Sequence, residues 1–400
     1  MAISVQDHQK DFSPLHNALQ TYIDKGILPC LNTLVLQGGD IVDVRYYGYL
    51  DLESKQSLPE DAIFRLYSGT KPITALAAMM LYESGKFQLD DPLAKYLPEF
   101  KDLQVLKADA KSIDDTEPGR PILIKHLMSH SAGFSYGFLD PASVIDRAYN
   151  GAKVNQILGQ GTLADLCGTL STLPLAYQPG TSWRYSVASD VLGALIEKLS
   201  DQSLDEFFKS RLFAPMGMVD TDFFVPENKH DRFTAMYASP HQNNPMAGDL
   251  FKVDDPKTGT YSRPKPFLSG GGGLVSTLED YVKIAQLFIN DGKFDQREYL
   301  KPETLALMRT NQLAENVNVQ FNFWPFSGTT FGLGIALKES LAENEHQAMI
   351  GECHWGGLAG VHIWLNPKSN VGGICMTQRM PSFWHPFSHE FKRLAYEIMC

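Results

Sequence analysis

The segment Ala62-Ile63-Phe64-Arg65-Leu66-Tyr67-Ser68-Gly69-Thr70-Lys71-Pro72-Ile73 holds a serine and a lysine one helical turn apart. An apolar stripe at helical spacing follows, made of Ile73, Leu76, Ala77, Met80 and Leu81. Gly85 stands where such a helix would end. Residues 62–67 are extended in character. We therefore predict a strand that leads into a buried helix, with Ser68 at the helix N-terminus.

The spacing places Ser68 and Lys71 on the same helix face. A serine hydroxyl is a weak nucleophile until a base takes its proton. Lysine can be that base when burial or a second cation lowers its pKa from about 10.4. The alternative is a purely structural role, with Ser68 as a helix-capping serine and Lys71 as a surface lysine. A second Ser-x-x-Lys, from Ser262 to Lys265, has proline at its third position, which disfavours a helix; we interpret it as a loop.

Tyr185 lies near the end of a loop at residues 178–187, and this loop precedes a predicted amphipathic helix at 190–199. Near a lysine ammonium its phenol would ionise more easily than usual and could relay protons to a leaving group. The alternative is an amphipathic tyrosine on a domain surface. Tyr237, followed by Ser239, offers a similar pattern, but it lies in irregular sequence with no helix to aim it.

Near the C-terminus, His354-Trp355-Gly356-Gly357-Leu358 lies between two apolar stretches. Paired glycines on a strand edge allow another backbone to approach closely. An amide there could serve as one donor of an oxyanion hole, with the Ser68 amide as the other. The alternative is a bulge in a core strand. His126 and His130 have a spacing that metal sites use, but no glutamate follows His126. We predict structural roles for both histidines and no metal.

Composition bounds the class of protein. A chain of 400 residues is longer than chains that fold around one hydrophobic core usually are, so two domains or one domain with a large insertion are expected. The net charge of −11 argues against a nucleic-acid partner. The N-terminus is polar, and no long uncharged stretch could span a bilayer. The five scattered cysteines suit reduced thiols. We expect a cytoplasmic protein without a membrane span.

The order of elements predicts the fold. Strands are expected at 31–37, 41–49, 331–337, 361–365 and 371–376, and helices at 13–25, 122–130, 190–199, 278–290, 302–311 and 387–399. Early and late strands separated by helices predict an α/β (α+β) protein with a largely antiparallel sheet built from both chain ends. We assign residues 1–100 and 267–400 to this sheet domain, and 101–266 to an inserted, mostly helical domain.

Taken in order, these pieces resemble the serine β-lactamase and penicillin-binding protein superfamily, most closely the class C β-lactamases and the family VIII carboxylesterases. The resemblance extends over most of the chain. It rests on residues 64–73, 89–98, 126–133, 179–186 and 355–357. It implies a β-lactamase/transpeptidase-like fold, an active site in the cleft between the two domains, and no cofactor.

Two departures from the lactamase pattern matter. Val187 stands where the lactamases have the asparagine of Tyr-x-Asn, and Trp355-Gly356-Gly357 stands in place of Lys-Thr-Gly. The missing lysine would bind a β-lactam or peptide carboxylate. Both replacements make the site more apolar, which resembles the esterases that accept uncharged acyl groups.

The resemblance therefore implies a serine hydrolase that cleaves small carboxylic esters, with short acyl chains, through an acyl-Ser68 intermediate. Lys71 and Tyr185 would share the proton transfers, and which of them rests deprotonated stays open. The amides of Ser68 and of Leu358, or alternatively Gly357, would hold the oxyanion. The expected substrate-binding residues are Trp355, Gly356, Gly357, Phe134 and Tyr136.

Other functions stay open on the sequence alone. The same machinery could belong to a β-lactamase or a D-amino-acid peptidase. It could belong to an acyltransferase if an alcohol replaced water. The fold could also serve as a non-catalytic binding module. The oligomeric state is not readable from the sequence.

Overall fold

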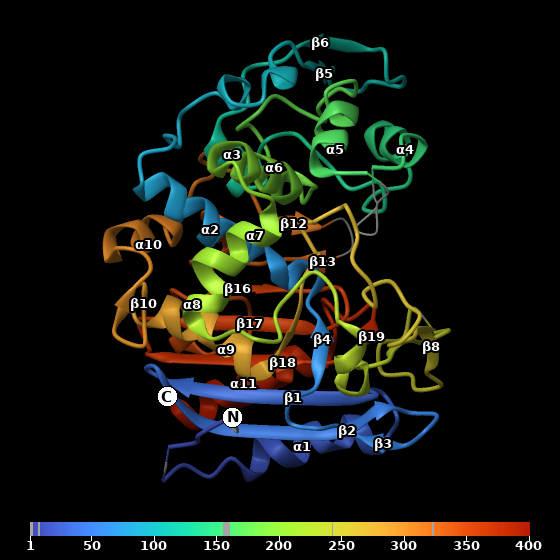
Figure 1. Cartoon of the computed structure of the whole chain (residues 1–400), viewed down its shortest axis with the longest axis vertical. Helices are drawn as coiled ribbons and strands as arrows, with labels where there is room; N and C mark the ends of the chain where they lie inside the picture. Colours follow the sequence, from blue (N-terminus) through green and yellow to red (C-terminus); the bar gives the residue numbers. More distant parts are fainter. Residues whose placement is uncertain (1–2, 7–8, 155–160, 242, 322–323) are drawn as a thin grey trace.

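The computed structural model describes residues 3–6, 9–154, 161–241, 243–321 and 324–400, and its main feature is an eight-stranded sheet in the lower half of Figure 1. The strand order is β14-β15-β16-β17-β18-β1-β2-β3, and all neighbours are antiparallel. The strands are β1 (Cys30–Gln37), β2 (Asp40–Asp51), β3 (Gln56–Ser57), β14 (Thr329–Phe331), β15 (Ala336–Lys338), β16 (Cys353–Gly356), β17 (Val361–Asn366) and β18 (Val371–Met376).

The sheet joins the two ends of the chain. N-terminal β1 pairs with C-terminal β18, with Leu34 opposite Ile374. Alternate residues of β1 enter different cores: Leu34 packs with α2 (Lys71–Glu83) and α9 (Leu278–Ile289), and Val35 packs with α1 (Ser13–Asp24) and α11 (Pro386–Met399). The sheet is thus covered on both faces. The predicted antiparallel sheet built from both chain ends is confirmed.

A group of helices lies above the sheet in Figure 1, with the β5–β6 pair at the top. Its elements are β5 (Gln104–Leu106), β6 (Thr116–Pro118), α3 (Ile124–Met128), α4 (Val144–Gly151), α5 (Leu163–Leu170) and α6 (Ala188–Ser200). Helix α6 packs against α2, which is buried from Lys71 to Leu81. Helix α2 therefore lies between the upper helices and the sheet. No helix in the described ranges is long and apolar enough to cross a bilayer.

A short strand pair fixes the approach to Ser68. Strand β4 (Ile63–Arg65) pairs with β9 (Val275–Thr277), with Arg65 opposite Val275. Arg65 is fully buried and forms an ion pair with Asp254 at 2.7 Å. The pairing brings the glycine-rich turn at residues 270–273 beside the start of α2.

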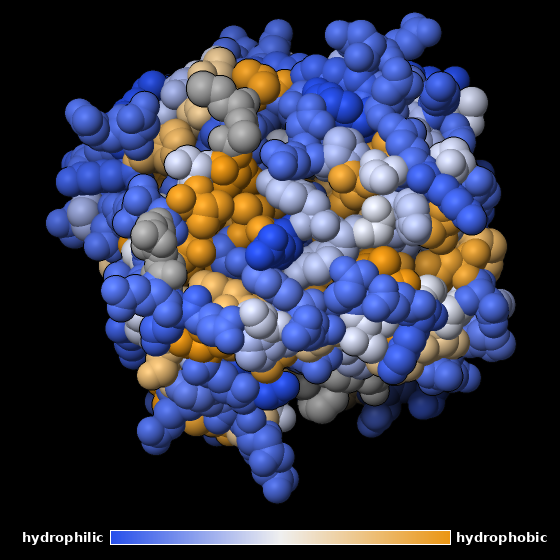
Figure 2. Space-filling view, turned by 90° about the horizontal axis from the view of Figure 1, so that it is seen from below, coloured by the Kyte–Doolittle hydropathy of each residue, from blue (hydrophilic) through white to orange (hydrophobic). Residues whose placement is uncertain are grey.

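The remaining elements are short. They are α7 (Leu204–Phe208), α8 (Ala214–Met216), α10 (Pro302–Met308), β7 (Met236–Ala238), β8 (Phe251–Asp254), β10 (Lys293–Phe294), β11 (Arg297–Glu298), β12 (Gln320–Phe321), β13 (Trp324–Pro325) and β19 (Arg379–Met380). Strands β19, β7 and β8 form a small sheet of their own. Seen from below, the surface is mostly polar, with hydrophobic residues in small patches between the polar ones (Figure 2).

Two local predictions were wrong. The single strand expected at 331–337 is a hairpin, because the chain turns between β14 and β15. Gly334, at φ +82°, makes that turn, and a side chain on it would collide with Ala75. The helix expected to begin at Ser68 begins instead at Lys71, after a 3₁₀ turn, Tyr67–Thr70.

Candidate active site

Ser68 lies in the 3₁₀ turn between β4 and α2, on the wall of a cavity. Tyr67, just before it, adopts a left-handed conformation with φ 46°. Non-glycine residues rarely adopt this conformation, which marks a backbone held in place by its surroundings. The sharp turn that results leaves Ser68 9% exposed at the start of the helix. Amide groups at such a position have no acceptor within the helix.

Lys71 is a basic group within hydrogen-bond distance of the serine hydroxyl. Its ammonium Nζ donates to Ser68 Oγ at 3.2 Å, to Tyr136 Oη at 3.1 Å and to the Gly271 carbonyl at 2.6 Å. The side chain is only 2% exposed. Burial lowers the pKa of Lys71 from 10.5 to about 7, and the charge of Asp190 partly opposes this shift. A buried lysine with such a pKa can lose its proton near neutral pH.

Tyr185 reaches the same hydroxyl from the segment before α6. Its Oη lies 2.5 Å from Ser68 Oγ. The ring packs against His130 at 5.0 Å and Trp355 at 5.3 Å between centroids. Burial raises the pKa of Tyr185 above its ordinary value of 10.0, and the hydrogen bond with Ser68 partly opposes this. Of the two groups beside Ser68, Lys71 is therefore the one that gives up its proton more easily.

The backbone after β16 approaches the serine turn closely. A side chain on Gly357 would lie 2.1 Å from the Leu66 carbonyl oxygen, so only glycine fits there. The Gly357 amide already donates to the Val361 carbonyl at 2.6 Å. The Leu358 amide has no acceptor in the described part of the chain, and Leu358 lines the cavity with Ser68. Between the two alternatives for a second oxyanion donor, the geometry favours Leu358.

Aromatic and aliphatic side chains form most of the cavity beside Ser68. Its described lining residues are Tyr67, Ser68, Tyr136, Phe138, Leu139, Tyr185, Phe321, Leu358, Phe383 and Trp384. None of these described residues carries a formal charge. Of the five expected substrate-binding residues, only Tyr136 is among them. Phe134 instead packs against Phe100 in the core, with the ring centroids 5.8 Å apart.

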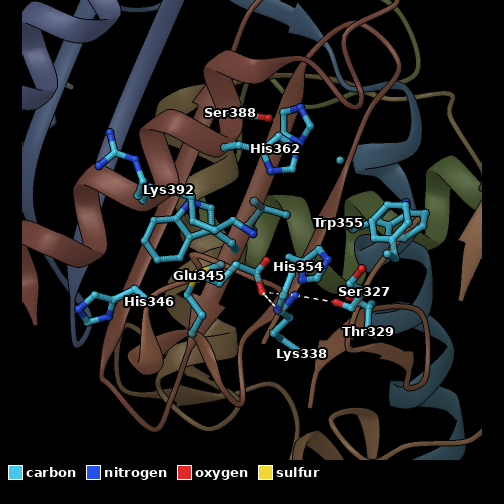
Figure 3. Close-up of a pocket in the computed structure, with 18 of the residues that line it drawn as sticks. Ser327, Thr329, Lys338, Glu345, His346, His354, Trp355, His362, Ser388 and Lys392 are labelled. Carbon is cyan, nitrogen blue, oxygen red and sulfur yellow. Dashed lines mark hydrogen bonds and ion pairs between the residues drawn. The ribbon is translucent and has the colours of Figure 1, made fainter. Parts of the chain in front are cut away.

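A larger cavity, of about 340 Å³, lies between α11 and the sheet and does not contain Ser68 (Figure 3). Trp355 and Gly356 line it. Figure 3 shows Lys338 between Glu345 and Ser327, and the ion pair to Glu345 measures 2.5 Å. Trp355 lines only this larger cavity and packs against Tyr185, and Phe383 lines both cavities.

A model of the Beta-lactamase family matches residues 15–396. The chain belongs to this family. Among curated relatives, esterase EstB of Burkholderia gladioli is 30% identical over 343 residues, which cover 83% of this chain and 81% of EstB. Lovastatin esterase of Penicillium rubens is 30% identical over 331 residues, 80% of each chain. A solved structure described as "EstCE1, a hydrolase with promiscuous acyltransferase activity" superposes with a TM-score of 0.81 at 26% identity, covering 96% of this chain and 97% of that one.

The patterns interpreted above as structural have ordinary partners. His126 Nδ1 accepts from the Leu123 amide at 3.2 Å. Tyr237 Oη donates to Glu53 at 2.6 Å. In the second Ser-x-x-Lys, Ser262 Oγ donates to the Gly259 carbonyl at 2.8 Å, and Lys265 lies over the Tyr261 ring.

Sequence reasoning missed three polar contacts to Lys71 or its surroundings. Tyr136, expected only as a substrate-binding residue, directs its hydroxyl at Lys71. The Gly271 carbonyl, in the turn at residues 270–273, accepts from the ammonium. Asp190, whose carboxylate accepts from the Gly271 amide, was read only as the start of a helix. A signal was available, because an aspartate in the first turn of an apolar helix needs a partner if it is buried.

Proposed function

We propose that this protein is a serine hydrolase that cleaves carboxylic esters of small, uncharged acids through an acyl-Ser68 intermediate. One observation carries the proposal. Ser68 Oγ lies within hydrogen-bond distance of both Lys71 Nζ, at 3.2 Å, and Tyr185 Oη, at 2.5 Å, on the wall of a cavity with no charged residue in its described lining.

The acylation step follows from these contacts. Neutral Lys71 accepts the hydroxyl proton as Ser68 Oγ attacks the ester carbonyl. The amides of Ser68 and Leu358 donate to the oxyanion that forms. As the ester C–O bond breaks, Tyr185 gives its proton to the leaving alkoxide and regains one from the Lys71 ammonium. The alcohol leaves, and Ser68 carries the acyl group.

Deacylation reverses these roles. Water loses a proton to the Lys71–Tyr185 pair and attacks the acyl carbonyl, and the proton returns to Ser68 as the carboxylic acid departs. If an alcohol attacked instead of water, the product would be a new ester. The description of EstCE1 as a hydrolase with acyltransferase activity supports this second outcome as a side reaction.

Two further observations support an ester substrate. A β-lactam or peptide substrate presents a carboxylate, and the described cavity lining offers no cation to bind it. Both EstB and lovastatin esterase are named as esterases. The residues of the proposed site come from both proposed domains, because Ser68, Lys71 and Leu358 belong to 1–100 and 267–400, and Tyr185 belongs to 101–266. This supports a cleft between those domains as the place of reaction.

Replacing the nucleophile tests the proposal. We expect Ser68→Ala to abolish hydrolysis of p-nitrophenyl butyrate and labelling by a fluorophosphonate probe, with unchanged circular dichroism. Ser262→Ala, in the second Ser-x-x-Lys, is the matched control and should retain both activities. Full activity in Ser68→Ala would refute the assignment of the nucleophile. Faster turnover of nitrocefin or a D-alanyl peptide than of the butyrate ester would instead favour the amide-directed alternative.

A further inference from the structure

Asp190 is a buried carboxylate that the acyl-transfer steps above do not use. It lies in the first turn of α6 and is 3% exposed. Its Oδ1 accepts from Ser269 Oγ at 2.5 Å and from the Gly271 amide at 2.9 Å. Burial raises the pKa of Asp190 above its ordinary value, and the charge of Lys71 and these two hydrogen bonds oppose that shift by favouring the ionised carboxylate.

The backbone of one residue connects this carboxylate to the catalytic lysine. The Gly271 amide donates to Asp190, and the Gly271 carbonyl accepts from Lys71 Nζ at 2.6 Å. A side chain on Gly271 would lie 2.7 Å from Asp190 Oδ2 and 3.0 Å from Tyr136 Oη. The glycine is therefore held between these groups, and Asp190 fixes the carbonyl that orients the ammonium.

Asp190 is also the charge that faces Lys71. The other polar and titratable groups around the ammonium are Ser68 on its own turn, Tyr136 from the segment after α3, Tyr185 from the segment before α6, and His130. Burial raises the pKa of both tyrosines and lowers that of His130, so all three are neutral near pH 7. Of these described groups, only Asp190 carries a charge that can stabilise the ammonium.

We propose that Asp190 is a positioning residue that orients Lys71 through Gly271 and holds back its deprotonation, so that it sets the pH at which Ser68 becomes nucleophilic. This inference rests on the proposed function, because it takes Lys71 as the base for Ser68.

The sign of the effect follows from the charge. Removing a negative charge beside Lys71 destabilises the ammonium and lowers the pKa of Lys71. Activity that needs neutral Lys71 rises as pH increases through that pKa, which is about 7 in the native protein. The rise should therefore occur at lower pH when Asp190 is neutralised. A residue that only supported the fold would change the rate or the stability without moving this midpoint.

The experiment measures the rate of Ser68 labelling by a fluorophosphonate against pH, followed by intact-protein mass. In Asp190→Asn, whose amide oxygen can still accept from Ser269 and Gly271, we expect the midpoint to fall by about one pH unit. Glu197→Gln removes a carboxylate farther along α6 and should leave the midpoint unchanged. Ser269→Ala removes one hydrogen bond to Asp190 but leaves its carboxyl group, so the midpoint should fall less than in Asp190→Asn.

The outcomes separate the two proposals. An unchanged midpoint in folded Asp190→Asn would overturn the role of Asp190 while leaving Ser68 as the labelled nucleophile. Absence of labelling at Ser68 in the native protein would overturn the proposed function itself. If Asp190→Asn does not fold, Asp190→Ser, which is smaller and also uncharged, is measured in its place, and an unchanged midpoint in folded Asp190→Ser would contradict the inference.

Discussion

At the scale of single residues, the chemistry depends on opposite effects of burial on two neighbouring groups. Burial disfavours the charged form of each, so the pKa of Lys71 falls and that of Tyr185 rises. The lysine can then rest neutral at neutral pH while the phenol stays protonated. In the proposed mechanism, this favours Lys71 as the resting base and Tyr185 as the proton relay, a choice the sequence left open.

The relay role of Tyr185 gives a prediction. Tyr185→Phe removes the hydroxyl that lies 2.5 Å from Ser68 Oγ. We expect kcat for p-nitrophenyl butyrate to fall about 100- to 10,000-fold, the range for loss of a general acid–base group. Steady-state kinetics with a matched thermal unfolding curve would measure it.

Tyr237→Phe is the control for this variant. It removes a hydroxyl bonded to Glu53 and to the Leu52 amide, so it should affect stability more than rate. A larger loss of kcat in Tyr237→Phe than in Tyr185→Phe would show that the relay tyrosine has been misplaced.

The residues that sequence reasoning placed together were those with local patterns. Ser68 and Lys71 are one turn apart, and Tyr185 precedes a helix that the pattern already predicted. The Tyr136 hydroxyl and Asp190 reach Lys71 only because α2, α6 and the turn at 270–273 pack together. Contacts between segments so far apart in the chain have no period or spacing that a single sequence could reveal.

At the scale of elements, the end of β16 controls the distance between the proposed oxyanion donor and the nucleophile. Gly357 lets this backbone lie against the Leu66 carbonyl. Strand β4 and the turn after it are held in turn by β9. The site is thus built where three backbone segments meet, which is why small residues are needed at the contact.

Gly357→Ala tests this packing. The added methyl group would lie 2.1 Å from the Leu66 oxygen, so the backbone carrying Leu358 must move away from Ser68. We expect kcat/KM for the butyrate ester to fall by about 100-fold or more, as for loss of an oxyanion-hole donor. Gly168→Ala in α5, with open space around it, is the control and should leave kcat/KM unchanged. Equal activity of the two variants would rule out this account of the donor.

Element types were predictable where the apolar period was long, as in α2, α9 and β1. The hairpin of β14 and β15 was not, because its turn lies inside an apolar run that reads as one strand. Glycine is needed at position 334 because a side chain there would collide with Ala75 on α2, and this contact depends on tertiary packing.

At the scale of the whole molecule, two cores lie on opposite faces of one sheet, and only one of them carries the proposed site. The core under α1 and α11 includes Trp364 and Phe391, whose rings lie 6.1 Å apart. Substitutions that remove side-chain volume from this core should reduce the stability of the fold without changing the proposed chemistry at Ser68.

Phe391→Ala tests the separation. The side chain is fully buried, so its loss should lower the free energy of unfolding by about 3–5 kcal/mol. Below the unfolding temperature, kcat for the butyrate ester should match that of the native protein. Arg393→Ala on the same helix removes only an exposed ion pair with Glu397 and should cost under about 1 kcal/mol. A changed kcat in folded Phe391→Ala would show that the two cores are coupled.

The pairing of β1 with β18 also has a consequence for biosynthesis. Strand β1 is complete at residue 37, but its partner spans Val371–Met376. While the ribosome makes the intervening chain, one apolar edge of the first hairpin has no neighbour, and such edges recruit other chains. Because β18 is made so late, we expect β1 to gain its second neighbour only after nearly the entire polypeptide has emerged from the ribosome.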